Sequence, residues 1–507
     1  MMKNIKYIII GLSCSVALFS GCKKFLNVVP IDNLTGNNYW QNKKDVEAFT
    51  SGLYQQFRAK VAGNDAKSFY LTFDVRNAPI EAIDKHLNIL AAGNIRNLQK
   101  EEDWSISGDK QGGGYGYYNM TNWKKFYDII QAANILTVQV DNIPTATFSE
   151  NDKKRYRAEA VFMRNLSYLF MVRLYGDVPY YTEAYHTAPL ARMPMVEVLE
   201  KCIADMKAVK EDLPWSYGDQ SIVAIRATRG SALALLMHLN MWAAAFDSGK
   251  ATAHYVETQK LGAELLANPG VYELLPLEKS KQIFKGRTKE GLFEVLQNSN
   301  YGEFFNVRSN LANLMTYYPY RGTIRETTNR AYYTTKYMES LYPTSGGPDK
   351  RLTTWFNKPF SGDASFQFLK FINVYGGEGT AVRNDDNIIV FRYADAILLA
   401  AEAAAETEDV GEAQRLVNMI RTRANASQIT TTGSDLKDDI YRERCRELMG
   451  EGHYYNDLVR TKRIMNAKFN LSTVMSVSDF IQGAWTWPIY KDAMNNNPYM
   501  KLNDFWK

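Results

Sequence analysis

The stretch of sequence that decides the fold runs from Asn387 to Arg460 and contains IIVFRYADAILLAAEAAAE, EAQRLVNMIRTRA and YRERCRELMGEGHYYNDLVR. The apolar residues of its first segment that share one helical face are Phe391, Ala394, Leu398 and Ala401. Those at offsets 0, 3, 4 and 7 of the second segment are Ala413, Leu416, Val417 and Ile420. The alanine-rich run at 400–405 leaves little side-chain bulk, so another helix can approach closely. The stretch therefore predicts three amphipathic helices, packed as in tetratricopeptide-type repeats.

The composition is that of a folded globular chain with an excess of aromatic rings. Of 507 residues, 46% are apolar and 23% are charged, which supplies ample material for a core. The formal charge of +5 is small for this length and no basic stripe is present, so the sequence argues against a nucleic-acid partner. The 32 Tyr, 24 Phe and 9 Trp exceed what a core requires, and we expect some of these rings to line a surface.

The first residues predict export and attachment to a membrane by lipid. Lys3 and Lys6 precede a mostly apolar run at 7–19, which is too short to span a membrane, and small residues then lead to Cys22. We therefore expect residues 1–21 to be a cleaved signal peptide. This end resembles a bacterial lipoprotein box, which implies that the thiol of Cys22 carries lipid; several acyl chains would give stable attachment. Ordinary secretion with a free cysteine is the alternative.

Two stretches, at about residues 58–120 and 297–386, interrupt a series of predicted helices. The helices are expected near residues 123–136, 156–175, 195–213, 228–245 and 253–266. Both interrupting stretches are rich in aromatic residues, which argues against disorder. Long irregular segments within a compact domain are usually functional. We therefore expect these two stretches to be loops that bind a ligand.

Several motifs resemble those of the SusD/RagB family, the surface nutrient-binding lipoproteins of Bacteroidetes. RYADAILLAAEA, from Arg392, is similar to the family segment RyAEvlLmyAEA. RAEAVFMRNLSYLFMVRLYGDVP, which ends at Pro179, is similar to RAEArflRAlaYfyLvrlYGdvP. CKKFLNVVP at the predicted lipid site resembles the C-x-x-FL-x-x-x-P start, and WPIY resembles the WPIP near the end, with Tyr490 in place of a proline. The resemblance covers residues 22–507 as a single domain.

The resemblance implies a mainly all-α fold, in which a tetratricopeptide-like helical-repeat spine displays long, irregular, aromatic-rich loops. It implies a lipid-anchored protein of the outer membrane that faces the cell exterior. Such a protein captures oligosaccharides and passes them to a TonB-dependent SusC-like channel. Lys23 and Lys24 stand where acidic residues often accompany export to the exterior. Peptide ligands, as in the RagB branch, are the alternative.

The sequence offers no catalytic or metal-binding constellation. The five histidines show no HExxH spacing, no G-x-S-x-G elbow occurs, and the glycine cluster at 112–116 lacks the GK[ST] of a phosphate loop. Glu443 and Glu447 alternate with arginines, which predicts a structural ion-pair ladder rather than an acid–base pair. We therefore expect a binding protein without cofactor or metal. A secreted hydrolase and a helical-repeat adaptor without a small ligand are the alternatives.

Aromatic side chains with polar neighbours indicate where the ligand binds. A flat ring packed on the apolar face of a sugar removes both from water with little loss of side-chain entropy, and polar groups then bind the hydroxyls. For any single candidate, a packing role in the core is an equal alternative. The candidates are Trp104, Tyr115, Tyr117, Tyr118, Tyr320, Arg321 and Trp355, with Asp74, Arg76 and Asn77 as polar partners.

Overall fold

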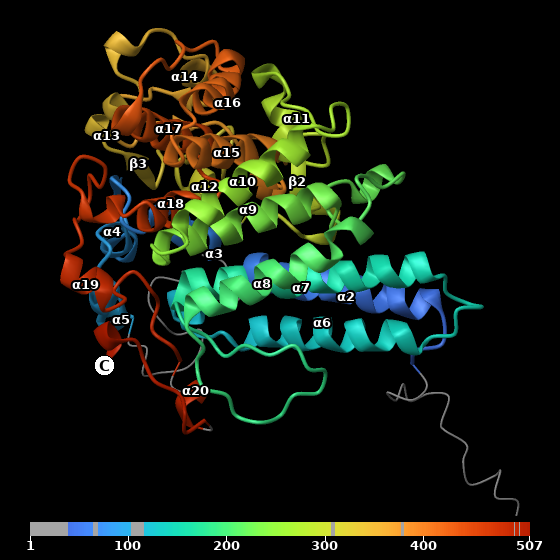
Figure 1. Cartoon of the computed structure of the whole chain (residues 1–507). Helices are drawn as coiled ribbons and strands as arrows, with labels where there is room; N and C mark the ends of the chain where they lie inside the picture. Colours follow the sequence, from blue (N-terminus) through green and yellow to red (C-terminus); the bar gives the residue numbers. More distant parts are fainter. Residues whose placement is uncertain are drawn as a thin grey trace, which may run out of the picture.

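Helices make up most of the protein, and the strands are few and short (Figure 1). This computed structural model describes residues 39–63, 69–102, 116–305, 310–376, 380–490, 492–495 and 497–507. The predicted all-α class is therefore confirmed. The predicted signal peptide, residues 1–21, and the predicted lipid site, Cys22, lie outside the described residues. Within the described ranges, no helix has the length and apolar character needed to cross a membrane.

Four helices lie side by side at the bottom of Figure 1: α2 (Lys43–Ala62), α6 (Lys124–Asn142), α7 (Glu150–Tyr175) and α8 (Met195–Val209). α7 packs against the other three and is buried along most of its length. It begins after Ser149, whose hydroxyl accepts a hydrogen bond from the Asp152 N–H. It ends at Gly176, where φ is +73°. The helix predicted at 156–175 is therefore confirmed, and it is the centre of this group.

A second group of helices lies above the first: α9 (Arg229–Phe246), α10 (Ala251–Leu266), α15 (Tyr393–Glu406), α16 (Val410–Arg423) and α17 (Gly433–Glu447). α10 packs between α9 and α15, and α15 packs in turn on α16 and α17. The backbones of α10 and α15 approach closely, because a Cβ atom built on Gly262 would lie only 2.7 Å from the Cβ of Ala400. The close helix packing predicted from the alanine-rich run is thus confirmed.

Two parts of the stretch 387–460 differ from the predicted helices. Residues Ile388–Arg392 form a strand, β8, which pairs antiparallel with β2 (Gly291–Val295), so that α15 begins only at Tyr393. The helix predicted there was too long, because a short, wholly buried, β-branched run fits a strand as well as a helix. The third predicted helix is divided into α17 and α18 (Tyr454–Arg460) by Gly450 and Gly452, which both have positive φ.

The two irregular stretches contain many short elements. β1 (Ile80–Ala82) of the first stretch pairs antiparallel with β3 (Ala331–Tyr333) of the second, which joins the stretches in space. The other short elements of the two stretches are α3 (Phe69–Val75), α4 (Lys85–Ala91), α5 (Ile95–Glu101), α12 (Leu311–Leu314), α13 (Thr335–Leu341), α14 (Arg351–Thr354), β4 (Phe356–Asn357), β5 (Gln367–Phe368), β6 (Val374–Tyr375) and β7 (Arg383–Asn384). A further short helix, α11 (Ser280–Lys285), lies before the second stretch.

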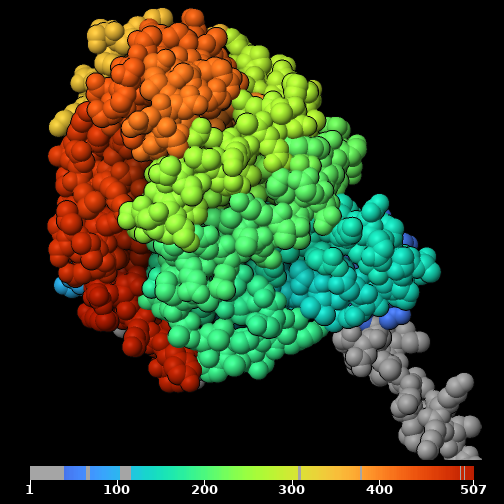
Figure 2. Space-filling view, viewed as in Figure 1, coloured from blue at the N-terminus to red at the C-terminus, as the bar shows by residue number. Residues whose placement is uncertain are grey.

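The C-terminal part of the chain lies along one side of the molecule. After α18 it forms α19 (Val477–Ile481) and α20 (Asp492–Asn495), and it ends near α5 (Figure 1). Figure 2 shows this part in red, against the green segment that contains α8. The last residues therefore lie beside α5, in the first irregular stretch.

Candidate functional site

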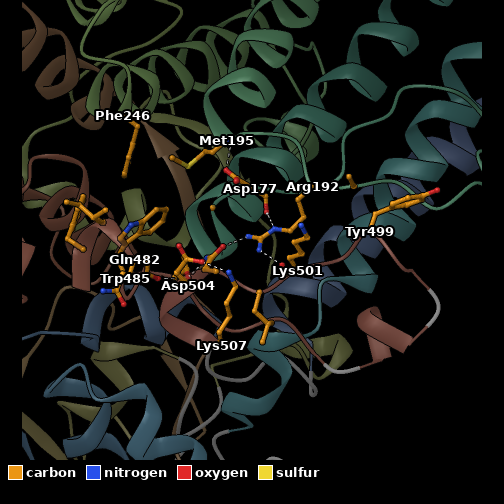
Figure 3. A pocket seen from close by; sticks show the side chains of 18 residues that line it. Asp177, Arg192, Met195, Phe246, Gln482, Trp485, Tyr499, Lys501, Asp504 and Lys507 are labelled. Carbon is orange, nitrogen blue, oxygen red and sulfur yellow. Dashed lines mark hydrogen bonds and ion pairs between the residues drawn. The ribbon is translucent and has the colours of Figure 1, made fainter. Parts of the chain in front are cut away.

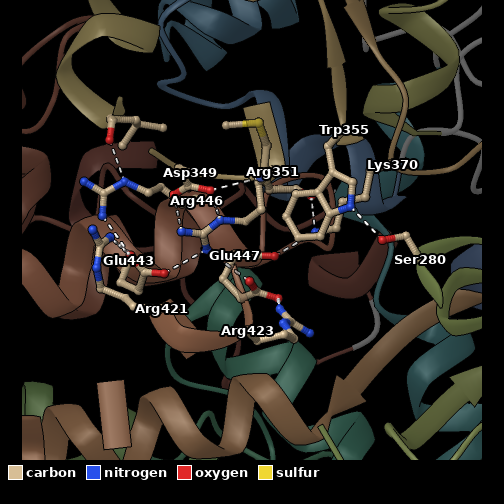
Figure 4. A network of polar contacts seen from close by, with 12 residues as sticks. Ser280, Asp349, Arg351, Trp355, Lys370, Arg421, Arg423, Glu443, Arg446 and Glu447 are labelled. Carbon is tan, nitrogen blue, oxygen red and sulfur yellow. Dashed lines mark hydrogen bonds and ion pairs between the residues drawn. The ribbon is translucent and has the colours of Figure 1, made fainter. Parts of the chain in front are cut away.

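Glu443 and Glu447 of α17 lie at the centre of a buried ion-pair network (Figure 4). Nη1 of Arg351 lies 2.7 Å from a carboxylate oxygen of Glu443 and 3.1 Å from one of Glu447. Arg421 and Arg423 of α16 pair with Glu443 and Glu447 respectively. A structural ion-pair network is therefore confirmed, but most of its arginines come from α14 and α16 rather than from a ladder along α17.

The charges around Glu443 make it unsuitable as a catalytic acid. Burial alone would raise the pKa of Glu443, but the guanidinium groups of Arg351, Arg446 and Arg421 lower it to about 2. A general acid needs a carboxyl group that is still protonated near the working pH. Glu443 therefore stays ionised and holds α14 and α16 to α17.

Trp355, a predicted ligand-contacting residue, lies inside the protein next to this network. Its side chain is 1% exposed, and its indole N–H donates a hydrogen bond to the Ser280 hydroxyl at 3.0 Å. The ammonium group of Lys370 lies 4.5 Å from the centre of the ring, which is a cation–π contact. Trp355 therefore packs in the core, and a ligand would reach it only if its neighbours moved.

Asp74 and Arg76, two of the predicted polar partners, are also buried. A carboxylate oxygen of Asp74 accepts a hydrogen bond from the Gly452 N–H at 3.0 Å. The Arg76 guanidinium donates to the Ala484 carbonyl at 2.7 Å and lies 4.6 Å from the ring of Tyr455. Because their polar groups are directed at the protein itself, these side chains fasten the first irregular stretch to the C-terminal part.

The remaining candidates in the described residues are dispersed. Tyr117 is fully buried, and Tyr118 packs edge-on against Tyr490, with ring centres 5.2 Å apart. Arg321 donates to the Thr316 carbonyl at 2.8 Å, and Tyr320 beside it is half-buried. The candidates therefore do not converge on one surface.

Trp104 and Tyr115 lie within residues 103–115, outside the described residues. Ligand contact by any of the ten candidates stays a prediction.

A large hollow lies beside the C-terminal tail, by which we mean residues 497–507. This tail hollow has a volume of about 700 Å³ and is lined by Asp177, Arg192 and Phe246, by residues between 480 and 486, and by the tail itself (Figure 3). Ligand pockets in proteins typically have volumes of about 300–1,000 Å³. The tail hollow is thus large enough for a small oligomeric ligand.

Arg192 fixes the tail in place and so forms the hollow. Its guanidinium donates to the Tyr175 carbonyl and to the Lys501 carbonyl, each at 2.7 Å. The Asn503 side-chain amide also donates to the Tyr175 carbonyl, at 3.1 Å. These bonds connect the last residues to the end of α7, where the helix leaves backbone carbonyls without partners in the helix itself.

Rings form one wall of the tail hollow and polar groups form its rim. Phe246 and Phe480 stack nearly parallel, 6.1 Å apart, and Trp485 lies against Phe246 at 5.2 Å. Tyr499 at the rim is 58% exposed, so a large part of its ring is open to solvent. Side chains such as Gln482 complete the lining. This combination suits a ligand with both apolar faces and hydroxyl groups.

A second, smaller hollow lies on the other side of the tail. This arginine hollow, of about 260 Å³, is lined by Arg96, Phe505, Trp506 and the predicted candidate Asn77. The Arg96 guanidinium lies 4.0 Å from the centre of the Phe505 ring. The Asn77 side-chain N–H₂ donates to the Thr473 carbonyl at 2.9 Å, while its buried oxygen has no hydrogen-bond partner in the described part of the chain. Asn77 is therefore a predicted candidate that lines a hollow and whose side-chain oxygen has no hydrogen-bond partner among the described residues.

Apart from Asn77, sequence reasoning missed the residues that form the two hollows. Arg192 and Phe246 lie in helical or connecting segments with no special pattern, and they meet the tail only in the folded chain. The one available signal was the set of rings Tyr499, Phe505 and Trp506 in an otherwise polar C-terminal end.

Comparison with known proteins gives matches along nearly the whole chain. A family described as "SusD family" matches residues 297–506, and one described as "Starch-binding associating with outer membrane" matches residues 26–240. SusD-like protein P38 of Formosa agariphila is 24% identical over 537 aligned positions, which cover 96% of each chain.

Solved structures show the same fold. The crystal structure of a SusD homolog from Bacteroides thetaiotaomicron has a TM-score of 0.82 and 40% identity, and the match covers 92% of this chain and 100% of that one. A laminarin-binding SusD-like protein has a TM-score of 0.68 at 19% identity, with 92% and 99% of the two chains covered. The family predicted from the sequence motifs is thus confirmed. With 40% identity to a SusD homolog over its full length, this chain belongs to the SusD family.

Proposed function

We propose that this protein is a non-enzymatic glycan-binding lipoprotein of the outer membrane, and that the tail hollow is where its glycan binds. The observation that carries the proposal is the composition of the hollow: a wall of aromatic rings, with the exposed Tyr499 at its rim, beside a set of polar side chains. The family matches support the same class of ligand, since one of them is described as starch-binding.

Four of the five charged residues that line the hollow already have partners within the protein, which favours a neutral ligand. Arg192 donates to backbone carbonyls, Asp177 accepts from the Met195 N–H at 2.8 Å, and Asp504 pairs with Lys507. A charged ligand would have to compete with these internal bonds. Sugar hydroxyls, in contrast, can form additional hydrogen bonds with the same groups while the internal bonds stay in place. This is our reason for preferring a glycan to a peptide, which is the alternative ligand.

Membership in the SusD family supports a proposal for where the protein is attached and which partner it serves. Cys22 would carry the lipid, the folded part would face the cell exterior, and the glycan would pass to a TonB-dependent SusC-like channel. Mass spectrometry of the processed protein tests for lipid on Cys22, and co-purification from the outer membrane tests for the channel. A processed chain without lipid would refute the proposed attachment.

Calorimetric titration with starch and laminarin oligosaccharides, and with peptides as a second panel, tests the site. We expect Tyr499→Ala to weaken glycan binding roughly two- to tenfold, because an aromatic contact contributes about 0.5–1.5 kcal/mol. Tyr185→Ala is the matched control: Tyr185 is 57% exposed, as Tyr499 is 58% exposed, but it does not line the hollow. Equal affinity in the wild type and in Tyr499→Ala would refute this location.

The same titrations decide between the alternatives. Glycan binding that is weakened in Trp104→Ala but not in Tyr499→Ala would move the site to the stretch at 103–115. Release of reducing ends from a bound polysaccharide by the purified protein would favour a hydrolase.

A further inference from the structure

Three helices bring a histidine and two carboxylates together at a place that does not line the tail hollow, although Asp247 directly follows Phe246 in the chain. Glu200 lies in α8, Asp247 directly follows α9, and His254 lies in the first turn of α10. Each side chain offers one potential ligand atom, and these atoms lie within 4.8 Å of one another. The Nε2 atom of His254 is 3.6 Å from a carboxylate oxygen of Glu200. The three residues are separated in the sequence by 47 and 7 positions, which matches no metal-binding motif, so the sequence analysis missed them.

The hydrogen bonds of His254 determine which of its ring nitrogens carries a lone pair. Asn240 donates through its side-chain N–H₂ to the Leu236 carbonyl at 2.8 Å, which fixes the orientation of its amide. The Asn240 oxygen therefore faces Nδ1 of His254, at 2.9 Å. An amide oxygen can only accept, so Nδ1 donates and the neutral ring has its lone pair on Nε2.

The Nε2 lone pair is directed at the carboxylates and has no partner of its own. His254 is 6% exposed, and Nε2 is buried without a hydrogen bond to any described residue. A buried acceptor without a donor is unfavourable, and histidines that bind metals commonly have the other ring nitrogen held by a carbonyl oxygen. His254 is thus arranged as a metal ligand would be, with Asn240 as the residue that orients it.

We propose that Glu200, Asp247 and His254 form a binding site for Zn²⁺. An imidazole nitrogen with two carboxylate oxygens suits this ion, whereas Ca²⁺ and Mg²⁺ prefer oxygen ligands alone. Bonds of about 2.0–2.2 Å in tetrahedral geometry place neighbouring ligand atoms about 3.3–3.6 Å apart. The 3.6 Å between Nε2 of His254 and the Glu200 oxygen already agrees with that spacing. Bound Zn²⁺ would join α8, the end of α9 and the start of α10.

Lys250 occupies part of this site when no metal is bound. Its ammonium group lies 3.0 Å from the same Glu200 oxygen, and its side chain is 61% exposed. Zn²⁺ would displace Lys250, whose long, exposed side chain can turn into solvent. Lys207, the other nearby lysine, pairs with Glu257 at 2.6 Å. Lys250 is therefore a competitor of the metal.

A second group of potential ligands, His238, Asp395 and His453, serves as a contrast. There Arg173 lies 2.9 Å from Nδ1 of His238, and Arg444 lies 3.0 Å from Asp395. Two guanidinium groups at these distances would repel a cation, and they already contact His238 and Asp395. Of these two groups of described residues, the one around His254 has a ring nitrogen without a hydrogen-bond partner and no buried guanidinium group beside it.

Metal content and thermal unfolding of the metal-free mature protein test the proposal. We expect ZnCl₂, but not MgCl₂ or CaCl₂ at the same concentration, to raise the Tm and to leave one Zn²⁺ per chain after dialysis. Lys250→Met should bind Zn²⁺ several-fold more tightly, because the competing ammonium group is gone. His254→Gln should lose both the bound Zn²⁺ and the Tm increase.

The controls keep the test independent of folding. His86→Gln, in α4, should bind Zn²⁺ as the wild type does. Glu200→Gln alters a side chain that is 35% exposed, so it should fold even if His254→Gln does not, and it should bind Zn²⁺ at least tenfold more weakly. Absence of a Zn²⁺-specific Tm increase in the wild type, or undiminished Zn²⁺ binding in Glu200→Gln, would overturn the proposal.

Discussion

At the scale of single residues, buried charges with several partners hold the irregular stretches to the helices. Arg351 is fully buried and contacts three carboxylates, those of Asp349, Glu443 and Glu447. Such groups lose their hydration on folding, so each depends on the others for compensation. Removing one member therefore leaves charges buried without sufficient partners.

We expect Arg351→Ala to lower the free energy of unfolding by about 3–5 kcal/mol, since it leaves buried carboxylates uncompensated. Arg415→Ala is the control, because Arg415 pairs with Glu412 at 2.6 Å but is 54% exposed, and exposed pairs contribute less than about 1 kcal/mol. Urea unfolding of both variants measures the difference. Equal losses in the two variants would contradict a special role for the buried network.

The same network predicts how stability depends on pH. Glu443 has a pKa of about 2 in the folded protein, below its ordinary value of 4.5. Its contribution is therefore fully present above about pH 4.5 and is lost as the pH falls toward 2, where the native carboxylate is protonated. Urea midpoints measured from pH 7 to pH 3 should fall most steeply below pH 4.5. In Glu443→Gln, which is less stable at neutral pH, this part of the fall should be reduced.

At the scale of helices and strands, the packing of α10 on α15 depends on a glycine, Gly262, which has no side chain to keep the helices apart. Gly262→Ala should lower the free energy of unfolding by about 1–3 kcal/mol, because its Cβ would lie 2.7 Å from that of Ala400 and the two helices would have to separate. Gly52→Ala is the matched control. Gly52 also lies inside a helix, but nothing lies within 4 Å of the added Cβ. Gly52→Ala should therefore raise the free energy of unfolding by up to about 1 kcal/mol. Stabilisation by both substitutions would contradict the close approach.

Helices were predictable from the sequence where their apolar spacing is long and regular. The segment 156–175 and the alanine-rich run at 400–405 show this, because period and length leave little choice of structure. The strand at Ile388–Arg392 was not predictable, since five consecutive buried residues fit the period of a helix and that of a strand equally well. Pairing with β2, which is distant in the sequence, determines that they form a strand. The break between α17 and α18 was signalled by Gly450 and Gly452, which the helical periodicity of the flanking residues obscured.

At the scale of the whole molecule, the candidate site is formed by segments about 300 residues apart. Tyr499 and Arg192 meet only because the tail returns to the end of α7. Sequence composition indicated a protein rich in rings, but it could not tell exposed Tyr499 from buried Trp355, because that depends on the tertiary neighbours of each ring. The predicted candidates were therefore mostly found in the core, while the hollow lies at the tail.

Deletion of residues 497–507 should abolish glycan binding and leave the helical frame intact. The tail supplies one side of the hollow but no helix of the two main groups, so the far-UV circular dichroism should change little. Asn503→Ala removes one attachment of the tail, to the Tyr175 carbonyl, and should weaken binding less than the deletion does. Wild-type affinity in the shortened protein would show that the glycan binds elsewhere.

The position of Lys507 at the lining of the tail hollow has a practical consequence for purification. A histidine tag fused there would place a flexible, polar peptide next to the opening, where it could occupy the cavity and imitate a weak ligand. It would also add foreign imidazoles to any metal titration. Affinity tags for this protein should therefore be removable, or be inserted at an exposed bend such as that around Gly218, where an added Cβ atom would meet nothing within 4 Å.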